Sequence, residues 1–152
     1  MTTTVQGISG LKAKVGEHLG YSKYVEITQE QVNLFADATG DHQWIHVDPE
    51  RAKAGPFGGP IAHGYLTLSM GPTLMPDILA VEGVAMGVNY GAGKVRFPAP
   101  VPVGAKLRLG AELKSVEDVG GGGAQVTMVF TFECEGAPKP SCVAEIIFRY
   151  YE

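Results

Sequence analysis

The sequence predicts a single α+β domain, with helices first and a run of antiparallel strands after them. In the first half of the 152-residue chain, apolar residues recur with helical spacing, whereas in the second half apolar and polar residues alternate with a period of two. Between these halves, residues 62–80 are apolar nearly all round, and a helix without a polar face belongs inside a protein. We therefore expect residues 1–152 to form one domain, in which an antiparallel sheet wraps a long central apolar helix.

The first predicted helix starts after Thr28 and ends at Gly40. Thr28 is a good N-cap, Gln31 stands three residues further on as in a capping box, and glycine is a common helix stop. The apolar face of this helix comprises Val32, Phe35, Ala36 and Thr39.

A short second helix is predicted from Asp48-Pro49 through Ala54, because a capping residue precedes a proline at the first helical position. Glycine and proline make 55–60 a loop. The long apolar helix should then be kinked or interrupted at Gly71-Pro72.

Period-two alternation predicts four strands in the second half of the chain, and a short edge strand is expected at 21–27. The first of the four is rich in glycine and should contain a bulge. Turns are expected at Gly120–Gly123 and around Pro138 and Pro140. The four strands are predicted at 84–97, 105–114, 125–133 and 144–150.

Composition excludes several classes of protein. The net charge of −4 argues against a nucleic-acid partner, which would require a basic face. No apolar run is long enough to cross a membrane, and the first residues lack the features of a secretory signal, so we expect a cytoplasmic protein. Cys134 and Cys142 flank a turn where a hairpin disulfide is conceivable, but without an export signal reduced thiols are favoured. The two cysteines lack the CxxC spacing of redox or zinc sites.

The segment 35–69 contains most of the residues that could carry chemistry. Asp41 and His46 lie five residues apart, just beyond the helix stop at Gly40, and on a turning loop both side chains can converge on one water molecule. A carboxylate and a neutral imidazole that share a water can move its protons. Alternatively, Asp41 caps the loop and His46 is a satisfied polar residue beneath it, and spacing alone leaves both interpretations open.

His63-Gly64 opens the long apolar helix. The first N–H groups of a helix are unpaired and carry partial positive charge, and glycine allows a ligand oxygen to approach them closely. A carbonyl oxygen placed there would be stabilised as in an oxyanion hole. The alternative is a glycine that is required only for tight packing.

A metal site is the weaker interpretation of the same segment. His42 and His46 have a spacing that suits a helix, yet Gly40 and Pro49 enclose a loop, and there is no HExxH motif or cysteine ligand. We expect neither a metal nor a cofactor. The possible ligands are Asp41, His42, His46, Asp48 and His63.

Five further residues have two interpretations each. Ser69, inside the apolar helix, either bonds back to the carbonyl four residues earlier or faces a ligand. Asn89 and Tyr90 line either the core or a site. Lys94 and Arg96 share one face of a strand, where they are either solvated or in contact with the phosphates of an acyl carrier.

Taken together, these residues resemble the MaoC-like hydratase family, which includes the R-specific enoyl-CoA hydratases. The third of the motifs listed below, with Asn89-Tyr90-Gly91 ahead of it, is most similar to the NodN-like branch. The three motifs occur in the family's order, within Thr28 to about Val116. They are Gly40-Asp41-x-x-x-Ile45-His46-x-Asp48, Pro60-Ile61-Ala62-His63-Gly64-x-Leu66 and Val95-Arg96-Phe97-Pro98-Ala99-Pro100-Val101-x-Val103-Gly104.

The resemblance implies a hot-dog fold, usually dimeric, and reversible syn addition of water to a trans-2-enoyl thioester. Asp41 and His46 match the family's catalytic pair, and Gly64 matches the glycine whose N–H binds the thioester oxygen. Ser69 matches a site serine of some members. Gln43 and Trp44 replace the family's usual Asn-Pro, so Trp44 raises the question of substrate size. The expected substrate-binding residues are Gly64, His63, Ala62, Tyr65, Ser69 and Asn89.

Three functions follow from these features. The first is an (R)-specific hydratase or dehydratase of enoyl-CoA or enoyl-acyl-carrier-protein thioesters, acting as a homodimer. The second is an acyl-CoA thioesterase on the same fold, which the paired Asp41 and His46 disfavour. The third is a non-catalytic acyl-thioester-binding protein, which the intact pair also disfavours.

Overall fold

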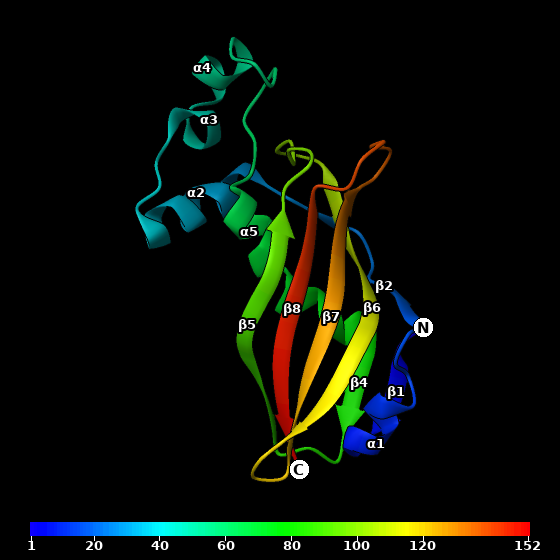
Figure 1. Ribbon diagram of the computed structural model, residues 1–152. Helices are drawn as coiled ribbons and strands as arrows, with labels where there is room; N and C mark the ends of the chain where they lie inside the picture. The colour runs from blue at the N-terminus through cyan, green and yellow to red at the C-terminus, as the bar shows by residue number, and fades with distance from the viewer.

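The computed structural model describes all 152 residues, and its main layer is a six-stranded antiparallel sheet (Figure 1). Five strands pair in the order β2-β6-β7-β8-β5. The short strand β3 also pairs with β6, at residues 106–107, next to the part of β6 that pairs with β2. β5 therefore forms one open edge of the sheet. The strands are β2 (His18–Tyr21), β3 (Val25–Glu26), β5 (Met86–Arg96), β6 (Lys106–Val119), β7 (Gly123–Cys134) and β8 (Cys142–Tyr151).

The four long strands that alternation predicted are confirmed, and the expected edge strand is two short pieces, β2 and β3. The predicted dry faces of β6 and β7 form the core, where Leu107, Leu113 and Phe132 are fully buried. β5 carries the predicted irregularity as two register shifts against β8. The inner face of β8 is less well covered, since Phe148 and Tyr150 are only half-buried.

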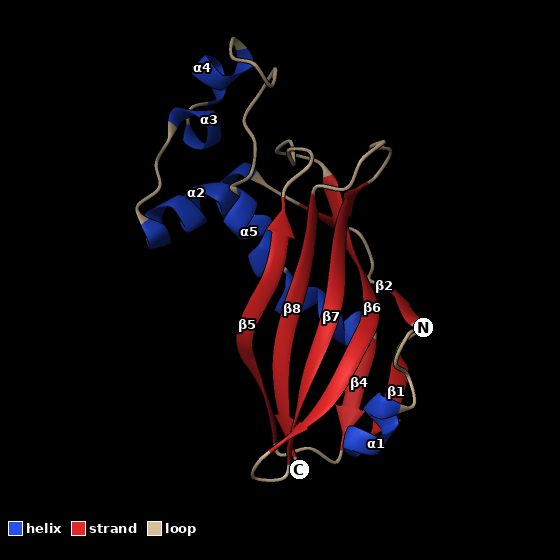
Figure 2. Cartoon of the chain, in the orientation of Figure 1, coloured by secondary structure: helices blue, strands red, loops and turns tan.

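A helical segment lies behind the sheet, and it is shorter and more broken than the sequence predicted (Figure 2). It consists of α5 (Gly64–Ser69), α6 (Gly71–Leu74) and the 3-10 turn η1 (Met75–Asp77). The interruption at Gly71-Pro72 is confirmed. No helix of the structure is long and apolar enough to cross a bilayer.

The helix start predicted at His63-Gly64 is confirmed, whereas the apolar stretch 62–80 extends beyond the helical segment at both ends. At the start, the Ala62 N–H donates to the carbonyl oxygen of Val101, so the chain is still extended there. At the end, β4 (Leu79–Glu82) pairs in parallel with β1 (Thr3–Gln6), an N-terminal strand that had no periodic signal. The segment also buries one side only, because the Tyr65 side chain is 72% exposed. A short helix, α1 (Gly7–Lys12), follows β1.

The first predicted helix is α2 (Gln29–Thr39). The Thr28 hydroxyl accepts from the Gln31 N–H at 3.1 Å, and Gly40 ends the helix with a left-handed φ of 83°. The other half of the capping box does not form, because the Gln31 side chain contacts the sulfur of Met70 instead. Thr39 is exposed rather than on the buried face, and its hydroxyl donates to the carbonyl oxygen of Phe35.

Candidate active site

The residues between α2 and α5 form an overhang beyond the end of the sheet (Figure 1). It contains α3 (Trp44–Val47), where the sequence predicted only a loop, and α4 (Pro49–Lys53), which was predicted. The Asp48 carboxylate caps α4 by accepting from the Arg51 N–H at 3.1 Å. The overhang brings His46 back over the start of α5, because the Ile61 N–H donates to the carbonyl oxygen of Ile45.

His46 is 6% exposed and is fixed by a backbone atom. Its Nδ1 lies 2.6 Å from the carbonyl oxygen of Ile61. A carbonyl oxygen only accepts, so Nδ1 carries the proton and Nε2 keeps a free lone pair. Burial lowers the pKa of His46 below its usual value, and the hydrogen bond to Ile61 opposes this shift without cancelling it. The imidazole is therefore neutral at pH 7 and can accept a proton.

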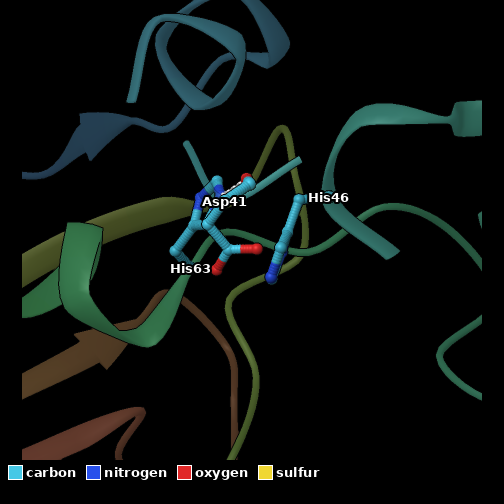
Figure 3. Close-up of side chains that lie close together, drawn as sticks. All are labelled: Asp41, His46 and His63. Atoms are coloured by element: carbon cyan, nitrogen blue, oxygen red, sulfur yellow. Dashed lines mark hydrogen bonds between the residues drawn. The ribbon is translucent and has the colours of Figure 1, made fainter. Parts of the chain in front are cut away.

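Asp41 faces His46 from beyond the end of α2, and its position is compatible with both interpretations of this aspartate. One carboxylate oxygen accepts from the Gln43 N–H at 3.3 Å, which is the structural role. The carboxylate also lies with the imidazoles of His46 and His63, and one polar atom from each falls within 4.8 Å of the others (Figure 3). Asp41 and His46 make no direct hydrogen bond, so a water between them can contact both.

Gly64 begins α5 directly beneath this group. Its N–H makes no hydrogen bond with the rest of the chain, and the residue lines a cavity of about 250 Å³ together with Asp41, His46 and His63. A side chain at Gly64 would meet the ring of Phe97 at 3.1 Å. The predicted donor therefore lies beside the predicted acid–base pair, as an oxyanion-hole arrangement requires. Tyr65 lines the same cavity.

A second cavity of about 350 Å³ adjoins the first and shares His46, Gly64 and Phe97 with it. Ala62, a predicted site residue, lies in its wall. Sequence reasoning missed most of its lining. Phe97 belongs to the third family motif and could have been found there. Nothing in the pattern singled out the others, which include Phe57, Thr67 and Ser141.

Ser69 and Asn89 do not line either of the two cavities beside His46. Both line a separate cavity of about 560 Å³ between the helical segment and strands β5 and β8, and neither Asp41 nor His46 lines it. The Ser69 hydroxyl donates to the carbonyl oxygen of Tyr65 at 2.6 Å, which is the back-bonded alternative.

The Trp44 ring packs within the overhang, outside the cavity lined by Asp41 and His46, the proposed catalytic dyad. The ring packs against Gly55 so closely that a Cβ added at Gly55 would lie 2.9 Å from it. On the ring also lies the guanidinium of Arg51, 4.5 Å from the ring centroid in a cation–π contact. Trp44 lines none of the cavities described here. It therefore holds α3 and α4 together and does not narrow the site.

The remaining charged candidates lie outside the cavities. His42 is exposed and pairs with Asp37 at 2.9 Å, which raises the pKa of this imidazole. Arg96 donates to the carbonyl oxygen of Val95 at 2.8 Å, and Lys94 lies near Glu145 on the outer face of the sheet. Cys134 and Cys142 are buried free thiols, and burial raises the pKa of Cys142 to about 11.

One group of side chains has the composition of a metal site, namely Asp41, His46 and His63. The sequence had offered His42 and Asp48 as further ligands, but these two are engaged elsewhere, by Asp37 and by the start of α4. Carboxylate and imidazole ligands suit several divalent ions. The same three side chains equally suit acid–base chemistry on a water, which needs no ion.

The fold and the site define a hot-dog protein with an aspartate and a buried histidine beside a helix start. The chain belongs to the family of MaoC-like domains, whose model matches residues 11–131. It is 58% identical over 147 residues to 3-hydroxyacyl-thioester dehydratase Z of Mycobacterium tuberculosis, covering 97% of each chain. It is 39% identical to nodulation protein N of Rhizobium leguminosarum bv. viciae, covering 92% of this chain and 88% of the relative.

Among solved structures, the R-hydratase PhaJ1 of Pseudomonas aeruginosa superimposes with a TM-score of 0.74 at 25% identity, covering 95% of this chain and 85% of that one. The predicted family, NodN-like branch and hot-dog fold are confirmed.

Proposed function

We propose that this protein is an (R)-specific hydro-lyase that adds water reversibly to trans-2-enoyl thioesters and gives (R)-3-hydroxyacyl thioesters. The observation that carries the proposal is the convergence of Asp41, a neutral His46 and the free N–H of Gly64 on one cavity. The 58% identity to a 3-hydroxyacyl-thioester dehydratase over 97% of both chains supports the same reaction.

The geometry suits the following sequence of events. A water bound between Asp41 and His46 loses a proton to this pair while its oxygen bonds to the β-carbon of the substrate. The electron pair of the double bond moves towards the thioester, and the Gly64 N–H stabilises the negative charge on the thioester oxygen. The acid–base pair then returns a proton to the α-carbon, so no cofactor is required by the balance of atoms.

The proposal includes a homodimer of single-domain chains, with a thioester of coenzyme A or acyl-carrier protein as substrate. β5 is an open sheet edge, and such edges are normally covered. Three large apolar side chains are exposed along it, Met86, Val88 and Tyr90. A second copy that pairs through β5 would cover both the edge and these side chains. The cytoplasmic location stays a prediction.

Purified protein should be tested with crotonyl-CoA and a series of longer enoyl-CoAs, with chiral analysis of the product. Loss of enoyl absorbance and formation of the (R)-3-hydroxyacyl product are expected. Release of free thiol without loss of enoyl absorbance would point instead to a thioesterase. Saturable binding of every thioester with no turnover would point to a non-catalytic acyl-binding protein.

A further inference from the structure

His63 is the third side chain of the site, and the reaction outlined above gives it no task. It is 3% exposed, and it lies 22 residues after Asp41 in the chain. Its backbone is the N-cap of α5, immediately before Gly64. It therefore stands between the helix start and the acid–base pair, where it can influence both.

The Nε2 atom of His63 lies 3.0 Å from the backbone carbonyl oxygen of Asp41 (Figure 3). Because this oxygen can only accept, Nε2 must carry the proton, and His63 is the donor. Among the hydrogen bonds of the chain, this is the one that joins the backbone of Asp41 to the start of α5. It fixes where the loop after α2 passes over the site.

The ring of His63 is held between two others. It stacks on the ring of His46 with centroids 3.9 Å apart and planes at 25°, and it packs on Phe35 with centroids 4.8 Å apart. His46 is thus fixed at one edge by the Ile61 carbonyl oxygen and on one face by His63. These two contacts together determine where the lone pair of Nε2 on His46 points.

Packing alone does not explain a histidine here. The Nδ1 atom of His63 is buried and has no hydrogen-bond partner. Burying an unpaired polar atom is unfavourable, so a phenylalanine of similar shape would fill the space better. The part of the side chain that phenylalanine cannot supply is the donor to Asp41.

We propose that His63 is a positioning residue of the hydration reaction, which sets the Asp41 loop through its Nε2–H and the His46 ring through stacking. This inference rests on the function proposed above. A displacement of about 1 Å in a reacting group can cost on the order of 100-fold in rate. Loss of the donor should therefore lower kcat while the substrate is still bound normally.

Two variants separate the donor from the rest of the side chain. His63→Phe keeps a stacked ring and removes the donor, whereas His63→Gln keeps an amide N–H at a similar reach. With crotonyl-CoA, we expect His63→Phe to lower kcat by roughly 30- to 100-fold with KM changed less than about threefold. We expect His63→Gln to recover at least about 10-fold of that loss. The melting temperature of His63→Phe should change little, because the unpaired Nδ1 and the hydrogen bond to Asp41 are lost together.

Recovery by glutamine is the readout that a merely structural role would not move, because glutamine restores the N–H donor without restoring the stacked ring. The same two substitutions at His18, an exposed histidine of β2, serve as the control and should leave kcat and KM unchanged.

Wild-type kcat in His63→Phe, or a loss of kcat that follows a fall in melting temperature and is not recovered by glutamine, would overturn this role alone. A wild-type protein that hydrates no enoyl thioester would overturn the proposed function as well.

Discussion

The imidazole of His46 donates its Nδ1 proton to the backbone carbonyl oxygen of Ile61, across a distance of 2.6 Å. This bond selects the tautomer whose free lone pair is on Nε2, the nitrogen available to a water beside Asp41. Both partners are buried, so water does not compete for the bond. The tautomer of His46, on which the proposed acid–base role rests, therefore depends on a main-chain atom of the segment that leads into α5.

Substitution of either Asp41 or His46 should strongly slow hydration. Asp41→Asn and His46→Gln are each expected to lower kcat on crotonyl-CoA by about 100- to 10,000-fold, the usual contribution of acid–base catalysis. Circular dichroism and melting temperature should show an intact fold. His42→Gln is the control, because this exposed histidine pairs only with Asp37 and should keep full activity. Near-normal rates in both dyad variants would contradict the assignment.

The pH dependence follows from the burial of His46. Because burial lowers its pKa, the neutral form persists below the usual value of about 6.5, and the acid limb of kcat/KM should lie below that pH. The unfolded chain binds a proton at His46 more readily than the folded one, so protonation favours unfolding. Stability should therefore be lost as the pH falls from about 6.5 towards the folded pKa. Titration of the His46 ring by NMR would measure the shift, and a pKa above 6.5 would contradict it.

A methyl group at Gly64 should block the thioester oxygen. Gly64→Ala places a carbon 3.1 Å from the ring of Phe97, and both residues line the cavity that contains Asp41 and His46. We expect kcat/KM to fall by about 100- to 1000-fold, the range seen when one oxyanion donor is lost. Gly59→Ala is the matched control, since a side chain there meets no atom within 4 Å. Equal activity of the two variants would remove Gly64 from the mechanism.

Pairing through β5 can be tested with a charge on that strand. Val88→Asp should weaken self-association by on the order of 100-fold in Kd, because it would bury an unpaired carboxylate between the copies. Sedimentation velocity over a range of concentrations measures the change. Val15→Asp is the control, since the exposed fractions of Val15 and Val88 are 44% and 42% and Val15 lies outside the sheet. A wild-type monomer, or equal effects of both variants, would exclude this interface.

Trp44 and Phe57 should have different effects on the enzyme. Trp44→Ala removes the packing on Gly55 and Arg51, and should lower the free energy of unfolding by about 1–3 kcal/mol without changing acyl-chain preference. Phe57→Ala enlarges the cavity beside His46 and should shift the preference towards longer acyl chains. Relative kcat/KM across an enoyl-CoA series distinguishes the two. A changed preference in Trp44→Ala alone would reverse these assignments.

The sequence predicted the sheet well because each strand carries its own signal. Alternation identified Leu107 and Phe132 as core residues without knowledge of their partners, and both are fully buried. The end of the central helix was not predictable in this way, because Leu79 leaves the helical segment to pair with Thr3, a partner 76 residues away. Local periodicity contains no information about such pairing.

The site residues divide in the same way, into those that local sequence signals indicated and those that depend on the folded chain. Asp41, His46 and Gly64 were identified by their order along the chain and by the family motifs. Ser69 and Asn89, which were grouped with them, line a separate cavity, because a one-dimensional motif does not say which side of a helix or strand faces Asp41 and His46. Phe57 and Ser141 come from two separate loops, and only the fold brings them together.

Both buried imidazoles of the site are anchored to carbonyl oxygens of the main chain, His46 to that of Ile61 and His63 to that of Asp41. Every amino acid supplies such an oxygen, so the anchors do not depend on the side chains that happen to neighbour them. Substitutions among those neighbours can therefore leave both anchors in place. The Gln43-Trp44 pair lies in the chain between Asp41 and His46, and neither of its side chains supplies an anchor to the two imidazoles.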